Sequence, residues 1–388
     1  AWGLVDPPAC ERLLDEVVAA WQGVGDPTLE PKLRLARTQL QLWAGNMIRC
    51  AIEGFACIEA AQRTGDEWVT MRANAYLGQV VAWVDPDASL VMHHEALDAA
   101  LRLGDPVGAT LATVGVASTH VGVLTDLAAA KPYIDEAIQR ADQLANPLLQ
   151  SWSASQQAIW FGFSGELAEA ERWASIADRY LVVVGQGIGP AGTGILHRSV
   201  IRSSTIYALS YARAQVGEHL EWIESLPELS ARSVAAGYLV TPAMIEVIHG
   251  AQMTYLRRYE EAEASLARGR AINERAGTEA AGVSGACFWT DLALVYGDLD
   301  EAKRRLATTD GSMIAARRSI SAIAASSCSS VICTLAFSRG SGSQNTAHCH
   351  SFTAIAIAAP KSTFRSAAAP PTSGASSPYR TSNKSSNC

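Results

Sequence analysis

A short turn signal recurs along this chain at intervals of 39 to 41 residues. It occurs at Gly25-Asp26-Pro27, Gly65-Asp66, Gly104-Asp105-Pro106 and Ala145-Asn146-Pro147. Glycine accepts the left-handed conformation just past a helix end. Asp or Asn caps the next helix by accepting a backbone N–H, and proline fits the first helical position. Each signal therefore predicts the end of one helix and the start of the next.

A second, softer break follows about 20 residues after the turn signal, at Gly122–Asp126, Ser164–Leu167, Gly217-Glu218 and Gly297–Asp300. Between the breaks, apolar residues fall three or four apart, which is the period of an amphipathic helix. One example is the stripe Leu127, Ala130, Ile134, Ala137, Ile138 and Ala141. The sequence thus predicts an all-α array of helical hairpins. Its spacing breaks once, between Gly185 and Gly237, where we expect an insertion.

The sequence predicts three segments that differ in composition and in helical periodicity. Residues 1–19 form a lead-in that belongs to the end of an upstream domain, residues 20–307 form the repeat, and residues 308–388 form a low-complexity tail. The tail has no Asp or Glu after Asp310 and no helical periodicity. We expect it to be disordered, or to be translated out of frame, in a chain that is a fragment of a longer protein. A membrane segment over residues 320–337 is a weaker alternative, since serines interrupt it.

Charge and cysteine usage exclude some classes of function. The first 310 residues carry 24 basic and 38 acidic side chains, so the array is acidic and unsuited to phosphate binding. We therefore expect no direct nucleic-acid binding and no membrane contact. No pair of the eight cysteines shows CxxC spacing, which favours buried thiols in the cytoplasm over a metal site.

No motif in the sequence predicts an enzyme, a catalytic residue or a cofactor held by this chain. Gly-Lys-Ser and Gly-Lys-Thr are absent, so there is no P-loop. The glycine-rich stretch at residues 185–189 resembles a dinucleotide loop but lacks βαβ context, and we interpret it as a loop between helices. His93 and His94 are adjacent and point about 100° apart on a helix, so we expect solvated or capping side chains and no metal. Glu260-Glu261 is expected on a solvated helix face.

Aromatic and polar side chains give the best candidates for ligand binding. Trp152 and Trp160 lie eight residues apart on one expected helix, with Gln156 between them. Together with His120 they could stack on and hydrogen-bond a small polar ligand in a concave groove. Arg198 and Arg202, at i and i+4, could hold an anion. The alternatives are packing between repeats for the aromatic residues and ion pairing for the arginines.

The phrase Gly-x-Leu-x-Glu-Ala, at Gly165–Ala170 and Gly297–Ala302, resembles the second helix of tetratricopeptide-type repeats. The period near 40 is closer to the variant in bacterial maltose-regulator-type transcription factors. Residues 88–307 resemble the helical arm of large ATP-binding LuxR-family transcriptional regulators, through residues 97–106, 128–146, 165–170 and 258–276. The resemblance implies a right-handed superhelical solenoid of antiparallel helix pairs.

It also implies a sensor and oligomerisation arm in the cytoplasm. Such an arm binds a protein partner or a small-molecule inducer in its concave groove, and homo-oligomers are among its assemblies. ATP is implied only for an upstream module, and DNA binding only for a downstream helix-turn-helix, neither of which is present in these residues. The alternatives are a free-standing adaptor for protein–protein interactions and the regulatory arm of a nucleotide cyclase.

Overall fold

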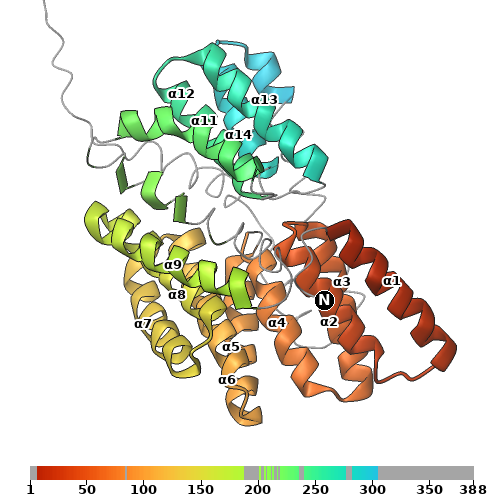
Figure 1. Ribbon diagram of the computed structural model, residues 1–388. Helices are drawn as coiled ribbons and strands as arrows, with labels where there is room; N and C mark the ends of the chain where they lie inside the picture. The colour runs from red at the N-terminus through yellow and green to blue at the C-terminus, as the bar shows by residue number, and fades with distance from the viewer. Residues whose placement is uncertain are drawn as a thin grey trace, which may run out of the picture.

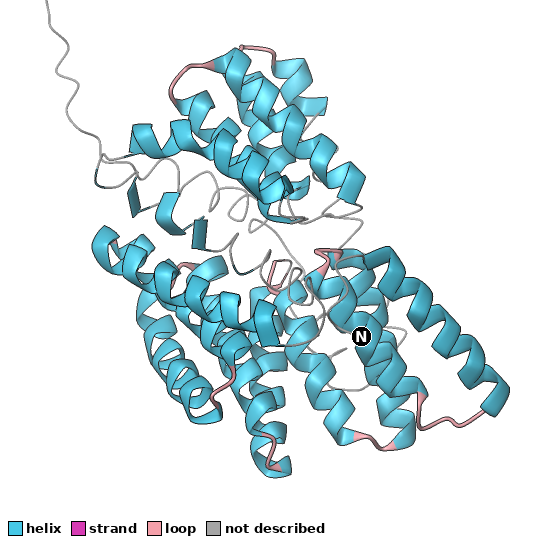
Figure 2. Ribbon diagram, in the orientation of Figure 1, coloured by secondary structure: helices cyan, strands magenta, loops and turns pink. Residues whose placement is uncertain are grey.

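The computed structural model describes most of the repeat region in helical form. Its described residues are 7–83, 85–187, 201, 205–206, 208–210, 212–213, 216, 219–235, 240–276 and 282–304. Within these ranges every regular element is a helix and no strand occurs (Figure 2). The prediction of an all-α chain is confirmed for this part. The predicted tail lies outside the described residues.

The helices recur with a regular spacing (Figure 1). The first group is α1 (Pro7–Val24), α2 (Glu30–Trp43), α3 (Met47–Thr64), α4 (Glu67–Val81), α5 (Pro86–Leu103), α6 (Pro106–Ser118), the π-helix η1 (Thr119–Leu124), α7 (Leu127–Leu144), α8 (Pro147–Ser164) and α9 (Leu167–Gly187). The second group is α11 (His219–Ala235), α12 (Val240–Tyr255), α13 (Tyr259–Ala276) and α14 (Gly282–Val295). From α3 to α9, successive α-helices begin 19 to 21 residues apart, which is two helices per predicted period.

The turn signals do what their chemistry predicts. Gly65 and Gly104 end α3 and α5 in the left-handed conformation, with φ of 70° and 64°. The side chains of Asp66 and Asp105 accept N–H groups at the starts of α4 and α6, and Asn146 does the same for α8. The residues of the turn signals therefore set the helix boundaries through local hydrogen bonds.

The softer breaks behave in the same way where they are described. Thr125, Gly165 and Gly297 all have positive φ, and Asp126 caps α7. The break at residues 217–218 lies outside the described residues. One expectation is wrong: α9 continues through Gly187, so the first part of the glycine-rich stretch at 185–189 is helical.

Odd-numbered and even-numbered helices differ in their contacts. Each helix from α1 to α8 packs on the next α-helix in the chain, and so does each from α11 to α13. Even-numbered helices also contact one another, in the pairs α2–α4, α4–α6, α6–α8 and α12–α14. The even-numbered helices therefore form an inner layer, over which the odd-numbered helices lie.

Burial follows these two layers. In the inner helix α6, every residue from Gly108 to Ala117 is buried. In the outer helix α7, the buried residues are Ala130, Ile134, Ala137 and Ala141, which confirms most of the predicted stripe. An inner helix needs apolar or small residues on all sides, whereas an outer helix needs one stripe.

One aromatic contact joins distant parts of the first group. The rings of Trp43 at the end of α2 and Trp152 on α8 lie 5.0 Å apart in an edge-on arrangement. Both side chains are buried in a core cluster whose members extend from Cys10 on α1 to Leu181 on α9 and Ile201. One side-chain contact therefore links α2 to α8.

One stretch, Pro106–Leu124, has the length and hydropathy of a membrane span. Of its most apolar window, 67% is buried inside the structure, and a buried core helix meets the same criteria. The stretch is therefore weak evidence for a membrane segment.

Candidate binding grooves

The aromatic candidates from the sequence lie in different surroundings. Trp152 is 8% exposed and packs on Trp43, while Gln156 is buried. Trp160 is half-buried, and its Nε1 donates to the backbone oxygen of Leu127 at 2.9 Å. Trp152 and Trp160 belong to two separate apolar clusters, so the structure does not bring them into one patch.

His120 lies on the π-helix η1, and its ring stacks on Tyr133 with centroids 6.0 Å apart. Burial lowers the pKa of His120, and Asp126 partly offsets that shift. Arg198 and Arg202 lie outside the described residues. A ligand-binding role for any of the six sequence candidates stays a prediction.

The adjacent histidines are not both solvated, and that expectation is wrong for His93. His93 is fully buried, and neither ring nitrogen has a hydrogen-bond partner in the described structure. Its ring fills the space beside Gly78 and Gly115 on neighbouring helices; a Cβ at Gly115 would lie 2.2 Å from His93 Cε1. Burial, with a smaller contribution from His94, lowers the pKa of His93 to about 3. His93 is therefore a neutral core residue.

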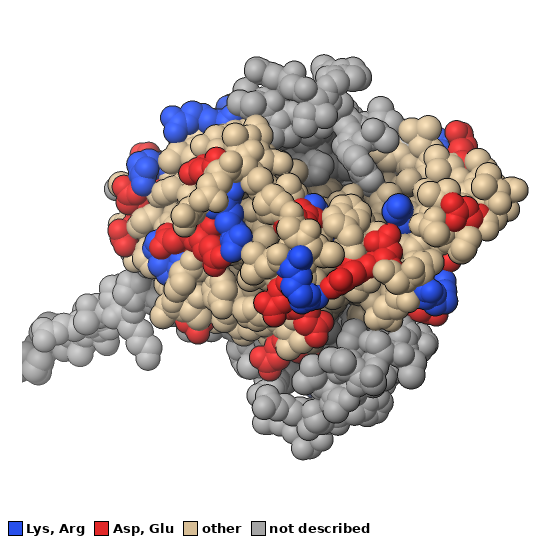
Figure 3. Space-filling view, turned by 90° about the horizontal axis from the view of Figure 1, so that it is seen from below, with Lys and Arg blue, Asp and Glu red and all other residues tan. Residues whose placement is uncertain are grey.

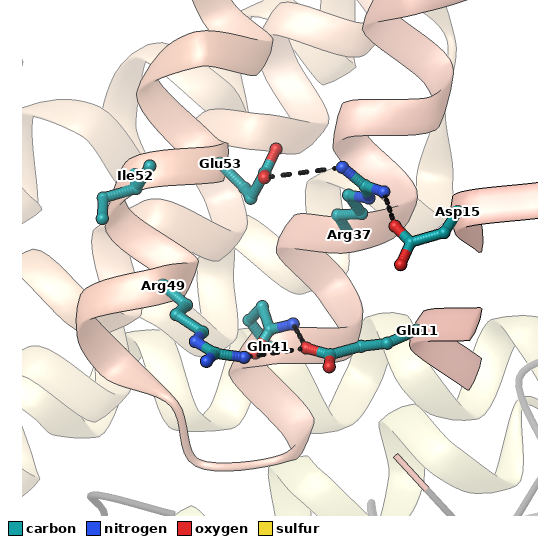
Figure 4. Close-up of a pocket in the computed structure, with 7 residues that line it drawn as sticks. All are labelled: Glu11, Asp15, Arg37, Gln41, Arg49, Ile52 and Glu53. Carbon is teal, nitrogen blue, oxygen red and sulfur yellow. Dashed lines mark hydrogen bonds and ion pairs between the residues drawn. The ribbon is translucent and has the colours of Figure 1, made fainter. Parts of the chain in front are cut away.

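Two polar grooves share one construction. In each, two odd-numbered helices form the walls and the even-numbered helix between them contributes to the floor. The first groove, about 320 Å³, is lined by Glu11 and Asp15 of α1, Arg37 and Gln41 of α2, and Arg49, Ile52 and Glu53 of α3 (Figure 4). The second, about 380 Å³, is lined by Glu224 and Pro227 of α11, His249 of α12, and Arg258, Glu261, Ala264, Ser265 and Arg268 at α13.

In the first groove, polar side chains tie α1 to the next two helices (Figure 4). Glu11 accepts a hydrogen bond from buried Gln41 at 2.6 Å and one from Arg49 at 3.2 Å. Arg37 pairs with Asp15 and lies 3.9 Å from Glu53. These groups are engaged with one another, so this groove serves to attach α1.

In the second groove, a buried polar network lies under an open rim. Glu246 on α12 is 4% exposed; its carboxylate accepts a hydrogen bond from Arg268 Nε at 3.1 Å and lies 3.0 Å from Arg268 Nη2 as an ion pair. Arg268 also donates to Ser265 Oγ at 2.7 Å, and Ser265 Oγ lies 2.6 Å from His249 Nδ1. Burial lowers the pKa of His249, which keeps the imidazole neutral at physiological pH.

The ion pairs at the rim of the second groove are exposed, so a ligand can take the place of one partner. Arg258 pairs with Glu261 through two bonds of 2.6 Å and reaches Glu224 on α11 at 3.4 Å. Exposed pairs of this kind contribute little to stability, typically about 0.2–1 kcal/mol, so a ligand can replace one partner at low cost. A fixed polar floor under a replaceable rim is what a binding groove for a polar ligand requires.

Sequence reasoning missed this groove, although a signal was present. Arg258, Glu261, Ser265 and Arg268 are spaced by three, four and three residues, which places them on one face of α13. The buried partners Glu246 and His249 come from another helix, and no local pattern connects the two. Glu261 lies on an exposed face, as expected, but it is paired with Arg258.

The surface charge around the grooves is mixed. On the face shown in Figure 3, basic and acidic side chains lie side by side. Each groove combines three carboxylates with two guanidinium groups when Glu246 is counted in the second. The described residues contain no group of three or more His, Cys, Asp or Glu side chains arranged to hold a metal ion.

No known protein-family model matches this chain, and no curated protein matches it significantly. The resemblance to the helical arm of LuxR-family regulators therefore depends on the repeat signatures in the sequence alone.

Proposed function

We propose that this chain is a helical-repeat binding arm, in which antiparallel helix pairs stack into a right-handed superhelical solenoid. The regular spacing of helix starts and the repeated caps support this proposal. A hairpin of this kind cannot bury its apolar face alone, so stacked units stabilise one another and present extended surfaces for binding.

The observation that carries the binding role is the network of Glu246, Arg268, Ser265 and His249 beneath the α11–α13 groove. The network holds its side chains in fixed positions before a ligand arrives, which reduces the entropy cost of binding. The groove offers guanidinium, carboxylate and imidazole groups together. Its ligand is therefore a polar small molecule or a polar segment of a protein partner.

In this proposal the chain is the sensor and oligomerisation arm of a LuxR-type transcriptional regulator in the cytoplasm. Binding in the groove shifts the equilibrium between resting and assembling states of the whole regulator. ATP binding and DNA binding belong to other modules, and this chain itself carries out no catalysis. The mixed charge in Figure 3 supports the absence of a nucleic-acid surface on that face.

A thermal-shift screen tests the binding role. The full chain is screened against sugars, nucleotides, amino acids, polyamines and short peptides, beside the variants Arg258→Gln and Arg232→Gln. Arg232 is also exposed and pairs with a glutamate on its own helix, which makes it a matched control. We expect at least one compound to raise the Tm of the wild type and of Arg232→Gln, with the shift lost in Arg258→Gln.

Two results would count against this proposal. One is a screen in which no compound depends on Arg258. The other is a tight, salt-sensitive complex of the purified chain with duplex DNA, measured by fluorescence anisotropy, because the proposal places DNA binding outside this chain.

A further inference from the structure

The imidazole ring of His249 is held in one tautomer by its neighbours. Arg268 Nη2 donates a hydrogen bond to Ser265 Oγ at 2.7 Å, and a guanidinium group cannot accept a hydrogen bond in return. Ser265 is fully buried, and its Oγ lies 2.6 Å from His249 Nδ1. The hydroxyl proton of Ser265 therefore points at Nδ1, because buried hydroxyls in folded proteins are hydrogen-bonded. Nδ1 is thus the acceptor, and the ring proton of the neutral His249 lies on Nε2.

The Nε2–H group of His249 is a fixed donor in the floor of the α11–α13 groove. His249 is only 5% exposed, but it lines the groove. No described residue bonds to Nε2, and this nitrogen is not enclosed by protein atoms, so it is open to the groove. The first groove differs, because its charged side chains bond to one another. The matching atom of a ligand in the α11–α13 groove is therefore a hydrogen-bond acceptor.

The rim of this groove places opposite charges side by side. Arg258 makes two bonds of 2.6 Å to Glu261 and reaches Glu224 at 3.4 Å. A ligand with only a carboxylate could replace Glu261 on Arg258, but it would leave Glu261 unpaired beside Glu224. A ligand with only an ammonium group could replace Arg258 on Glu261, but it would leave Arg258 unpaired. A ligand that carries both charges leaves every charged group at the rim paired.

The geometry of the rim also limits the distance between the two charges of such a ligand. Arg258 and Glu261 are three residues apart and in direct contact, so the positions for the two ligand charges are adjacent. An α-amino acid carries its ammonium and carboxylate groups on one carbon, whereas the two ends of a peptide are separated by its length. The groove volume of about 380 Å³ is that of a small-molecule site, and Pro227 and Ala264 add apolar wall for a side chain.

We propose that the α11–α13 groove binds a free amino acid. The carboxylate of the ligand binds Arg258, its ammonium group binds Glu261 and Glu224, and His249 Nε2–H donates to an oxygen of the ligand. Ser265 is a positioning residue, because it sets the proton on Nε2 and is itself fully buried. This inference rests on the proposed function, since it names the ligand class of the same groove.

Isothermal titration calorimetry of the full chain tests the ligand class. The probes are the twenty free L-amino acids, followed by the N-acetyl and C-terminal amide derivatives of those that bind. We expect at least one free amino acid to bind, and each derivative to bind at least about tenfold more weakly because it lacks one of the two charges. The inference is overturned if no free amino acid binds, or if a derivative binds as tightly as its parent.

Two variants of His249 test the donor. His249→Phe keeps a ring without an N–H group, and we expect it to weaken amino-acid binding about tenfold. His249→Gln keeps an N–H donor near the end of the side chain and should retain most of the affinity. Glu228→Gln changes an exposed carboxylate on α11 that pairs with Arg232, and it should bind like the wild type. Circular dichroism checks that the variants are folded. Wild-type affinity in His249→Phe would overturn the role of His249.

The tautomer can be measured without any ligand. In a long-range ¹H–¹⁵N spectrum of the full chain labelled with ¹⁵N-histidine, the signal missing from His249→Gln belongs to His249. We expect its proton on Nε2 in the wild type and in Ser265→Thr, which keeps the hydroxyl, and we expect the Nδ1–H form to appear in Ser265→Ala. A wild-type proton on Nδ1 overturns the inference. If sugars, nucleotides or polyamines alone bind in a manner that depends on Arg258, the proposed binding role stands and the amino-acid inference falls.

Discussion

The helices α3–α9 and α11–α14 bury histidines in opposite ways. His93, between α4, α5 and α6, lies among glycines with no hydrogen-bond partner for its ring. His249, on α12, bonds to Ser265 within a network that includes Arg268 and Glu246. Buried polar side chains bond between helices in both groups, as Ser89 Oγ does to the backbone oxygen of Gly78 at 2.8 Å, but the His249 network lies beneath an open groove. Polar groups along the sides leave a polar floor to which a ligand can bind.

The largest expected effect concerns the caps of the first group. Asp105 caps α6 and also accepts bonds from Arg72, at 3.0 Å, and from Trp68, at 2.9 Å. The Asp105 and Arg72 side chains are each only 12% exposed. Asp105→Ala removes the cap and leaves Arg72 unpaired, so we expect a loss of about 3 kcal/mol in the free energy of unfolding.

Urea denaturation measures this loss, and Asp126→Ala is the matched control. Asp126 caps α7 at an exposed site, through a bond of 3.0 Å to the amide of Ala129. Its removal should cost about 1 kcal/mol. Equal losses for the two variants would show that Asp105 acts as a cap alone.

The next effect concerns the glycines around His93. Gly115→Ala places a Cβ 2.2 Å from the His93 ring, and we expect it to cost about 2–3 kcal/mol in urea denaturation. The control Gly23→Ala has no atom within 4 Å of the new Cβ and should stabilise α1 slightly. Adding His93→Ala to Gly115→Ala should recover part of the loss. A neutral Gly115→Ala would contradict the close packing.

Acid should destabilise the first group through His93. The pKa of His93 is about 3 when folded, against an ordinary value of 6.5. The unfolded chain therefore binds a proton that the folded chain does not, and stability is lost as the pH falls below about 6.5. We expect a loss of about 2 kcal/mol between pH 7.5 and pH 5.

The variant His93→Phe isolates this contribution, since phenylalanine has a similar shape and no titratable group. The loss is measured by urea denaturation at each pH, as the difference between the wild type and the variant. His120 and His249 also have lowered pKa values, but they are unchanged in both proteins. Parallel pH profiles for wild type and variant would refute the assignment.

The smallest effect concerns the second group. Ser265→Ala removes the partner of His249 and one acceptor of Arg268, and should cost about 1–2 kcal/mol in thermal or urea denaturation. Ser225→Ala on α11 removes an exposed hydroxyl that bonds only to its own helix, and should cost less than about 0.5 kcal/mol. If the two losses agree, the network does not stabilise α12 against α13.

Much of the fold follows from the sequence, and little of the site does. The turn signals at Asp66, Asp105 and Asn146 predict helix starts that the structure confirms. A tryptophan on a helix face can serve packing or a ligand; Trp152 is buried against Trp43, and a ligand-binding role for it stays a prediction. His93 was expected to be solvated or to cap a helix. Its burial could not be predicted, because adjacency on a helix does not tell which face points inward.

The sequence by itself determined where helices begin and end, since caps and left-handed glycines act within a few residues. It also determined the apolar stripes of the outer helices, because a helical period can be read from a short stretch of sequence. The tertiary structure decided which helices form the inner layer, that α2 meets α8 across 109 residues, and that Glu246 meets Arg268. These contacts depend on the rotation accumulated from helix to helix, and no local pattern in the chain specifies that rotation.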